Sequence, residues 1–152
     1  MTSGFRSIIL GSDHAGFELK EYIGRTLEKH GKFFFDSGVH SAESSDYPDI
    51  AFNAALAVSQ NKYDCGILIC GTGIGMSITA NKVQGIRAAL CTSAYHAEMS
   101  RKHNNANILC LGSRVTDQES ALQIIEIFLE TPFDKYSRHQ KRIELIYQRT
   151  GR

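Results

Sequence analysis

The stretch that decides the fold is residues 65–80, CGILICGTGIGMSITA, in which an apolar run meets a glycine-rich turn. Its first six residues are continuously apolar rather than alternating, as expected for a strand covered on both faces by other layers. Glycines at 71, 73 and 75 then allow a tight turn, and a helix is predicted from Met76 to Asn81. The stretch therefore predicts a buried strand whose carboxyl end leads into a glycine-rich loop and a helix.

Short apolar runs alternate with longer amphipathic segments along the rest of the chain. The apolar runs predict further strands at Ser7–Gly11, Lys32–Asp36, Arg87–Cys91 and Ile108–Gly112. Periodicity and capping residues also predict helices. The first contains Leu19, Tyr22, Ile23 and Leu27 and ends at Gly31. The others run from Pro48 to about Gln60, from Ala94 to His103, from a Thr116–Glu119 capping box through Leu129, and from about Arg138 to Gln148. Such alternation indicates one parallel sheet with helices on both faces.

The predicted fold class is α/β, a three-layer Rossmann-like sandwich around a five-stranded parallel sheet, because right-handed crossovers leave few other topologies. No composition break, repeat or low-complexity stretch divides the chain, so residues 1–152 are expected to form one domain. In such folds ligands bind beyond the carboxyl ends of the strands, where the strand order reverses. The loops that follow the strands are therefore the places to look for a site.

Composition and charge exclude several classes of protein. The apolar fraction of 42% and the charged fraction of 22% are those of a globular chain. Seventeen basic against 16 acidic side chains produce no overall basic field for nucleic acid or an anionic membrane. No apolar run approaches the ~18 residues that span a bilayer, and residues 1–6 lack the apolar core of a signal peptide. We expect a cytoplasmic protein that binds neither nucleic acid nor membrane.

The cysteines and histidines do not predict a disulfide framework or a metal site. The cysteines form no CxxC pair, and each lies in or at the end of an apolar run: Cys65, Cys70, Cys91 and Cys110. His96 and His103 are seven residues apart, but no third ligand is evidently placed to complete a metal site. The other histidines are expected at the surface or on helix flanks. Free buried thiols are the plainest interpretation of the cysteines, with Cys70 as the exception considered next.

Cys70 stands directly before the glycine-rich loop, and the two features together suggest chemistry. Successive backbone N–H groups of such a loop can point at one anion, and a following helix adds its positive end. The loop is neither a GxGxxG dinucleotide fingerprint nor a Walker loop, since no GK[ST] follows. A thiolate at a helix N-terminus has a reason for a lowered pKa. A base next to an anion-binding loop suits proton abstraction alpha to a carbonyl.

Seven motifs, in order along the chain, resemble the family of ribose-5-phosphate isomerase B, which also contains the relatives of galactose-6-phosphate isomerase. They are GSDHAGF near the start, DYPD at 46–49, GILICGTGIGMSITANK, GIRAAL, RKHNNAN, LGSR and the closing RHQKR. The resemblance extends from Ile8 to about Ile146. It implies interconversion of ribose 5-phosphate and ribulose 5-phosphate through a cis-enediolate, in the non-oxidative branch of the pentose phosphate pathway, without a metal or organic cofactor.

The resemblance also implies roles for individual residues. Cys70 would move the proton between C1 and C2, as in the thiol branch of the family, because residues 71–80 contain no acid. Backbone N–H groups would stabilise the negative oxygen: those of Gly71, Gly73, Ile74 and Gly75. Ring opening and contacts to the sugar would fall to Thr72, His103, Asp13, Tyr47 and Asn104. Four side chains would grip the phosphate: His14, Arg114, Arg138 and Arg142.

The family also implies a shared active site. It places His103, Asn104 and Arg114 across a dimer interface from Cys70, so we expect a homodimer, or a tetramer built from such dimers. Arg138 and Arg142 are four residues apart on one predicted helix face, where two guanidinium groups can converge on a dianion. This pair belongs to a basic segment, since residues 135–152 carry six Lys and Arg side chains against one Glu.

Taken singly, these residues have plainer interpretations. Cys70 alone would be a core thiol, His103 a surface residue at a helix end, the two arginines a solvated face, and Asp13 a helix cap. Two other functions also stay open: isomerisation of a hexose 6-phosphate of the allose or galactose type, and a non-catalytic phosphosugar- or nucleotide-binding module. Because galactose enzymes tend to divide the catalytic residues between two different subunits and this chain carries the complete set, a pentose phosphate is favoured.

Overall fold

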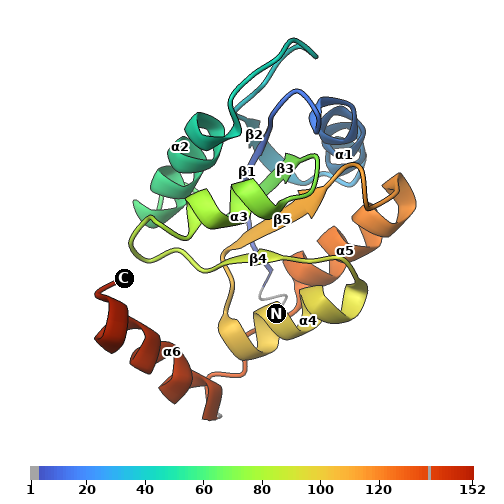
Figure 1. The fold of residues 1–152 in the computed structure, drawn as a ribbon. Coiled ribbons are helices and arrows are strands. Elements are labelled where there is room, and N and C mark those ends of the chain that lie inside the picture. Colours follow the sequence, from blue (N-terminus) through green and yellow to red (C-terminus); the bar gives the residue numbers. More distant parts are fainter. Residues whose placement is uncertain (1–3, 137) are drawn as a thin grey trace.

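One parallel sheet organises residues 4–136 and 138–152, the part of the chain that the computed structural model describes (Figure 1). Its strands are β1 (Ser7–Ser12), β2 (Phe33–Asp36), β3 (Cys65–Cys70), β4 (Ala88–Leu90) and β5 (Ile108–Gly112). They lie in the order β2-β1-β3-β5-β4, and every neighbouring pair is parallel. The chain turns outward in opposite directions from β1 and β3, so the switch point of the sheet lies between these two strands.

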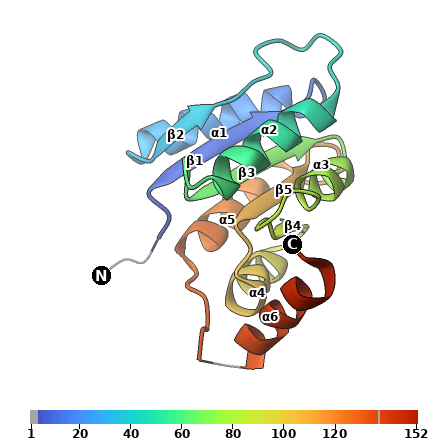
Figure 2. The ribbon, with the colours of Figure 1, turned by 90° about the vertical axis from the view of Figure 1, so that its left-hand side faces the viewer.

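Helices cover both faces of the sheet, as the alternation of elements predicts (Figure 2). They are α1 (Phe17–Lys29), α2 (Tyr47–Ser59), α3 (Ile74–Ala80), α4 (Ala94–Asn104), α5 (Gln118–Glu130) and α6 (Arg138–Thr150). Alternate residues of β3 enter two separate cores, with Ile67 and Ile69 facing α1 and α5 and Leu68 facing α2 and α3. Burial on both faces explains why this strand is continuously apolar.

The α/β sandwich and its five parallel strands confirm the predicted fold class, but β2 is not covered on both faces. Phe33 and Phe35 on one face of β2 are 66% and 49% exposed, while Phe34 packs against the core on the other face. The reason is that β2 is the edge strand beyond β1. The apolar run predicted the strand correctly and its burial wrongly.

The start of α5 also differs from the prediction. Its N-cap is Asp117, whose carboxylate accepts the Ser120 N–H at 2.9 Å and the Ser120 hydroxyl at 2.8 Å. These bonds lower the pKa of Asp117. The Thr116–Glu119 capping box is therefore wrong. The Thr116 side chain is buried instead, and its Oγ1 has no hydrogen-bond partner among the described residues.

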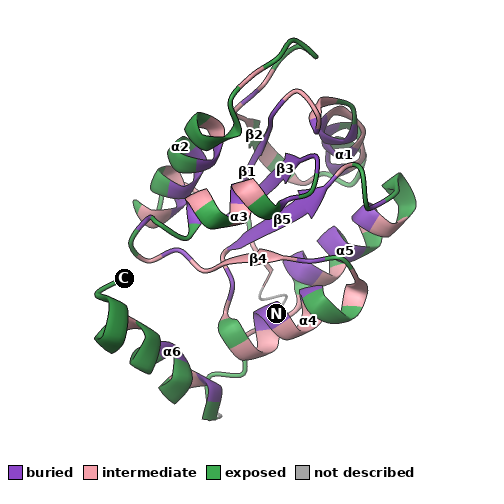
Figure 3. Ribbon diagram, viewed as in Figure 1, coloured by how far each residue is buried: buried purple, intermediate pink, exposed green. Residues whose placement is uncertain are grey.

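Helix α6 stands apart from the rest of the molecule. It packs mainly against α4, and only its first half buries side chains, those of His139 and Ile143 (Figure 3). Arg87 reaches across to α6 and donates a hydrogen bond to the Tyr147 hydroxyl. Leu145 and Ile146 stay largely exposed on α6. Within the described ranges no helix is long and apolar enough to cross a membrane.

Replacing Thr116 with Val tests the account of the α5 start. The substitution keeps the shape of the side chain and removes a buried hydroxyl without a partner. We expect Thr116→Val to raise the free energy of unfolding by about 1 kcal/mol, measured by urea denaturation. The matched control is Thr131→Val, because the Thr131 hydroxyl donates to the Ile127 carbonyl at 2.6 Å. That variant should lose about 1 kcal/mol. Destabilisation by Thr116→Val would show that its hydroxyl is hydrogen-bonded.

Candidate active site

The loops that follow β1, β3 and β5 meet at the carboxyl edge of the sheet and are hydrogen-bonded to one another. The N–H of Asp13, after β1, donates to the Ile69 carbonyl of β3 at 3.1 Å. Ser113, after β5, joins all three loops. Its N–H donates to the Cys70 carbonyl at 2.9 Å and its hydroxyl to the Ala15 carbonyl at 2.7 Å. Sequence reasoning missed this role of Ser113, although a small hydroxyl residue directly after a central strand was a usable signal.

Cys70 is the last residue of β3, and the glycine-rich loop folds back over its sulfur. The side chain is buried, and the N–H of Gly73 donates to Sγ at 3.1 Å. Gly73 has a φ of +78° as the N-cap of α3, and a Cβ there would lie 2.5 Å from a methyl carbon of Leu90. Both its conformation and its surroundings therefore require glycine. Thr72 lies exposed beside it, and its Oγ1 accepts the N–H of Ile74 at 3.3 Å.

The other three thiols are buried without such a loop. All the cysteines are free, and burial raises the pKa of the Cys65 and Cys110 thiols far above the usual range. Burial also raises the pKa of Cys91 to about 11. These three side chains are thiols at neutral pH and act as core residues, as their apolar surroundings in the sequence predict. The position of Cys70 at the strand end distinguishes it from them.

Two side chains pack directly on the glycines of the loop. The ring of Tyr47, the first residue of α2, lies on Gly75, where a Cβ would come within 2.4 Å of the Tyr47 Cζ. The guanidinium of Arg114 lies against Gly71, with Nη1 3.1 Å from the position of a Cβ there. The Arg114 N–H also donates to the Gly71 carbonyl at 3.0 Å. The expectation that Arg114 lies across an interface from Cys70 is therefore wrong, since it sits beside the same chain's loop.

Asp13 and His14 hold the entrance to α1 and the long loop before α2. The Asp13 carboxylate is buried and accepts the Gly16 N–H at 3.0 Å. The N-cap of α1 is Gly16 and has no side-chain cap, so Asp13 closes the turn before the helix and the helix-cap interpretation is wrong. His14 donates its backbone N–H to the Ser45 hydroxyl at 3.0 Å, and its Nδ1 accepts the Ser45 N–H at 3.1 Å. The same Nδ1 lies 3.3 Å from the Ser45 carbonyl oxygen, so Ser45 contacts His14 through its hydroxyl, its N–H and its carbonyl.

His103 and Asn104 lie at the opposite edge of the sheet. They end α4, which leads into the amino end of β5, whereas Cys70 lies beside the carboxyl end of that strand. The five residues of β5 span about 16 Å. The ring of His103 stacks on that of His139, with centroids 3.9 Å apart, and His139 is buried at the start of α6.

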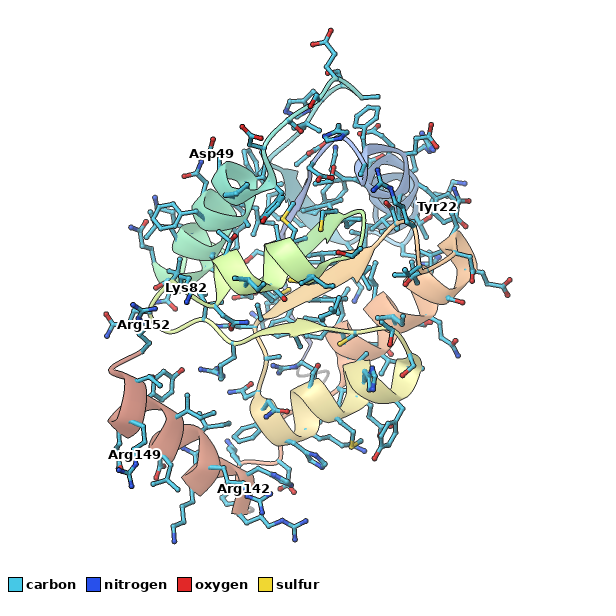
Figure 4. All side chains as sticks on the ribbon, viewed as in Figure 1. Tyr22, Asp49, Lys82, Arg142, Arg149 and Arg152 are labelled. Carbon is cyan, nitrogen blue, oxygen red and sulfur yellow. The ribbon has the colours of Figure 1, made fainter. Side chains whose placement is uncertain are left out.

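Arg138 and Arg142 lie on α6, the helix of His139, whose ring stacks on His103; Figure 4 labels Arg142 on this helix. One copy of the chain therefore holds two groups of predicted site residues. The first group lies around Cys70 and contains Asp13, His14, Tyr47, Thr72 and Arg114. The second lies around His103 and contains Asn104, Arg138 and Arg142.

The group around Cys70 suits acid–base chemistry on a small anionic molecule. It combines a thiol at a strand end, backbone N–H groups at the start of α3, a carboxylate, an imidazole and a guanidinium. Developing negative charge next to the thiol would meet N–H donors. Among the residues described, no set of three or more His, Cys, Asp or Glu side chains is arranged to hold a metal ion.

Comparisons with known proteins agree with this geometry. Residues 8–146 match the family model described as Ribose/Galactose Isomerase. Ribose-5-phosphate isomerase B of Escherichia coli strain K12 is 46% identical over 93% of this chain and 94% of its own length. D-erythrulose-4-phosphate isomerase of Pectobacterium atrosepticum is 44% identical over 84% of this chain and 85% of its own.

A solved structure, that of Clostridium thermocellum ribose-5-phosphate isomerase B, has the same fold. It superposes with a TM-score of 0.91 at 49% identity and covers 93% of this chain and 95% of its own. The Trypanosoma brucei type B enzyme superposes with a TM-score of 0.90 at 48% identity, over 95% of this chain and 98% of its own. The family model covers residues 8–146, and relatives 46% and 44% identical match over most of their length, so this chain belongs to the ribose/galactose isomerase family.

Proposed function

We propose that this chain is a ribose-5-phosphate isomerase that interconverts ribose 5-phosphate and ribulose 5-phosphate in the non-oxidative branch of the pentose phosphate pathway. The observation that carries the proposal is the Cys70 sulfur at the end of β3, with the Gly73 N–H 3.1 Å away. Relatives named ribose-5-phosphate isomerase B support the choice of substrate, at 46% identity in the E. coli protein.

The proposed chemistry moves only protons. In the open-chain aldose, the Cys70 thiolate removes the proton from C2, and the carbonyl oxygen at C1 becomes the oxygen of a cis-enediolate. The Cys70 thiol then returns the proton to C1, while the C2 hydroxyl proton moves to the C1 oxygen. This leaves a hydroxyl at C1 and a carbonyl at C2, which is the ketose. N–H groups of the loop stabilise the enediolate: those of Gly71, Gly73, Ile74 and Gly75. Because no electrons leave the substrate, the reaction requires no redox cofactor.

Other side chains open the ring and hold the substrate in this proposal. Thr72 and His103 assist opening of the furanose, and Asp13 bonds the sugar hydroxyls with the carboxylate oxygen that does not accept the Gly16 N–H. Tyr47 and Asn104 contact the sugar. The phosphate dianion is bound by cationic and polar side chains: His14, Arg114, Arg138 and Arg142.

A homodimer completes the site in this proposal. Cys70 and Arg114 come from one subunit, while the partner subunit's His103, Asn104, Arg138 and Arg142 complete the pocket. The support is geometric, because within one copy Cys70 lies beside the carboxyl end of β5 whereas His103 and Asn104 precede its amino end. The free cysteines fit a reducing compartment, and we place the enzyme in the cytoplasm.

An assay on several sugar phosphates tests the proposed substrate. In the presence of EDTA, we expect a higher kcat/KM for ribose 5-phosphate than for allose 6-phosphate or galactose 6-phosphate. Erythrulose 4-phosphate belongs in the same assay because of the named relative in P. atrosepticum. Faster turnover of a hexose phosphate would replace the substrate, and binding without turnover of any sugar would leave a phosphosugar-binding module.

Replacing Cys70 with Ala tests the base. General acid–base catalysis contributes on the order of 10²–10⁴-fold, so Cys70→Ala should lower kcat by about this factor. Exchange of deuterium from solvent at C2 should fall equally, while calorimetry should show that inorganic phosphate still binds. The matched control is Cys65→Ala, which removes a buried thiol at the opposite end of β3 and should keep its activity. Retained isomerisation in Cys70→Ala would refute the assignment.

Mixing two inactive variants tests the shared site. Cys70→Ala and His103→Ala chains should each be inactive alone. After denaturation and refolding together, half the dimers are mixed and each carries one intact site, so about a quarter of the original activity should return. Absence of recovery, with mixed dimers confirmed by mass spectrometry, would place the whole site in one chain.

A further inference from the structure

A buried lysine lies beside the candidate site and has no part in the chemistry above. We propose that Lys20 and Asp36 form a positioning pair that holds Asp13 and His14 in place for the substrate. The inference rests on the proposed function, in which these two residues contact the sugar and the phosphate. Lys20 itself touches neither the loop of Cys70 nor, in this proposal, the substrate.

The ammonium group of Lys20 is shielded from water and held by two carboxylates. The residue is 1% exposed, and its Nζ lies 2.5 Å from Oδ2 of Asp36 and 2.8 Å from Oε1 of Glu21. His40 lies 3.9 Å from the same Asp36 oxygen, but its side chain is 74% exposed, where solvent weakens an ion pair. Lys20 is therefore the cation that fixes the position of Asp36.

Asp36 in turn fixes the end of β1 through hydrogen bonds of the backbone. Its second oxygen, Oδ1, accepts the Gly38 N–H at 2.8 Å. The Gly38 carbonyl in turn accepts the Ser12 N–H at 2.8 Å, and the Val39 N–H donates to the Ser12 carbonyl at 2.9 Å. Both backbone groups of Ser12, the residue directly before Asp13, are thus held by the segment that Asp36 anchors.

The contacts close into a ring. The Asp13 carboxylate accepts the Gly16 N–H, the Gly16 carbonyl accepts the Lys20 N–H at 2.9 Å, and the Lys20 side chain contacts Asp36. The loop anchored at Gly38 continues to Ser45, which bonds His14 through its hydroxyl and its N–H. Breaking the ion pair would loosen both supports of the Asp13–His14 segment, at Ser12 and at Ser45.

Stability alone does not explain a lysine at this place. Burying an ammonium group is costly, and apolar residues of similar volume often replace a buried ion pair with no loss of stability. What an apolar pair would lack is the carboxylate that orients the Gly38 N–H. The two carboxylates around Lys20 therefore differ in role, because Asp36 reaches the loop while Glu21 is bonded to Lys20 from the same helix.

This difference provides a matched pair of variants. Asp36→Ala and Glu21→Ala each remove one carboxylate from Lys20, but only the first removes the acceptor for Gly38. We expect Asp36→Ala to lower kcat/KM for ribose 5-phosphate on the order of 10-fold, since misplacement by about 1 Å can cost up to 10²-fold. Most of the loss should be a higher KM, with a matching rise in the inhibition constant of inorganic phosphate. Glu21→Ala should change neither constant.

Lys20→Met is the second route to the same effect. It should match Asp36→Ala, and the double variant should be no worse than either single one because both break one coupling. Hydrogen exchange should be faster at the amides of Ser12, Gly38 and Val39 in both variants and unchanged in the rest of the sheet.

The outcomes separate this inference from its alternatives. Equal losses in Asp36→Ala and Glu21→Ala, or faster exchange throughout the sheet with a lowered melting temperature, would show a merely structural ion pair and overturn the inference. Unchanged KM in both Lys20→Met and Asp36→Ala would also overturn it. If the unaltered protein does not isomerise ribose 5-phosphate, the proposed function fails, and the exchange experiment still decides whether the pair holds the loop.

Discussion

All five strands run in the same direction, and the rest of the molecule depends on this constraint. It brings the loops after β1, β3 and β5 to one edge, where Ser113 and Asp13 bond them together. It also sends the end of α4 to the opposite edge, because α4 must return the chain to the start of β5. The same geometry that assembles the surroundings of Cys70 therefore keeps His103 of that chain away from them.

At the carboxyl edge of the sheet, the glycines determine the packing as much as the residues with side chains do. The glycines of the loop leave room for Leu90 at Gly73, Tyr47 at Gly75 and the guanidinium of Arg114 at Gly71. The backbone can then come close enough to Cys70 for an N–H to reach its sulfur. Lys20 and Asp36 apply the same principle on the other side of the site, where a side chain fixes a backbone segment and the backbone fixes the residues next to it.

Local sequence patterns predict the fold correctly for those elements whose burial can be read from their own residues. The bounds of β3 and β5 match the apolar runs because both strands are covered on two faces. The exposure of Phe33 could not be predicted from the sequence, because it follows from the order of the strands in the sheet rather than from the neighbouring residues. The cap of α5 was missed for a different reason: Thr116 and Asp117 are both good caps, and only the entry direction of the chain chooses between them.

The sequence predicts a set of candidate site residues but not their arrangement in space. The motifs contain both Cys70 and Arg138, but they do not show that Cys70 ends β3 while Arg138 begins α6, a helix that packs against α4. The separation has a consequence for α6 in the proposed dimer. This helix has little packing of its own, and a helix of 13 residues is marginal without tertiary contacts. A partner that buries Leu145 and Ile146 would order the arginines and complete the pocket in one step, so assembly and phosphate binding would stabilise each other.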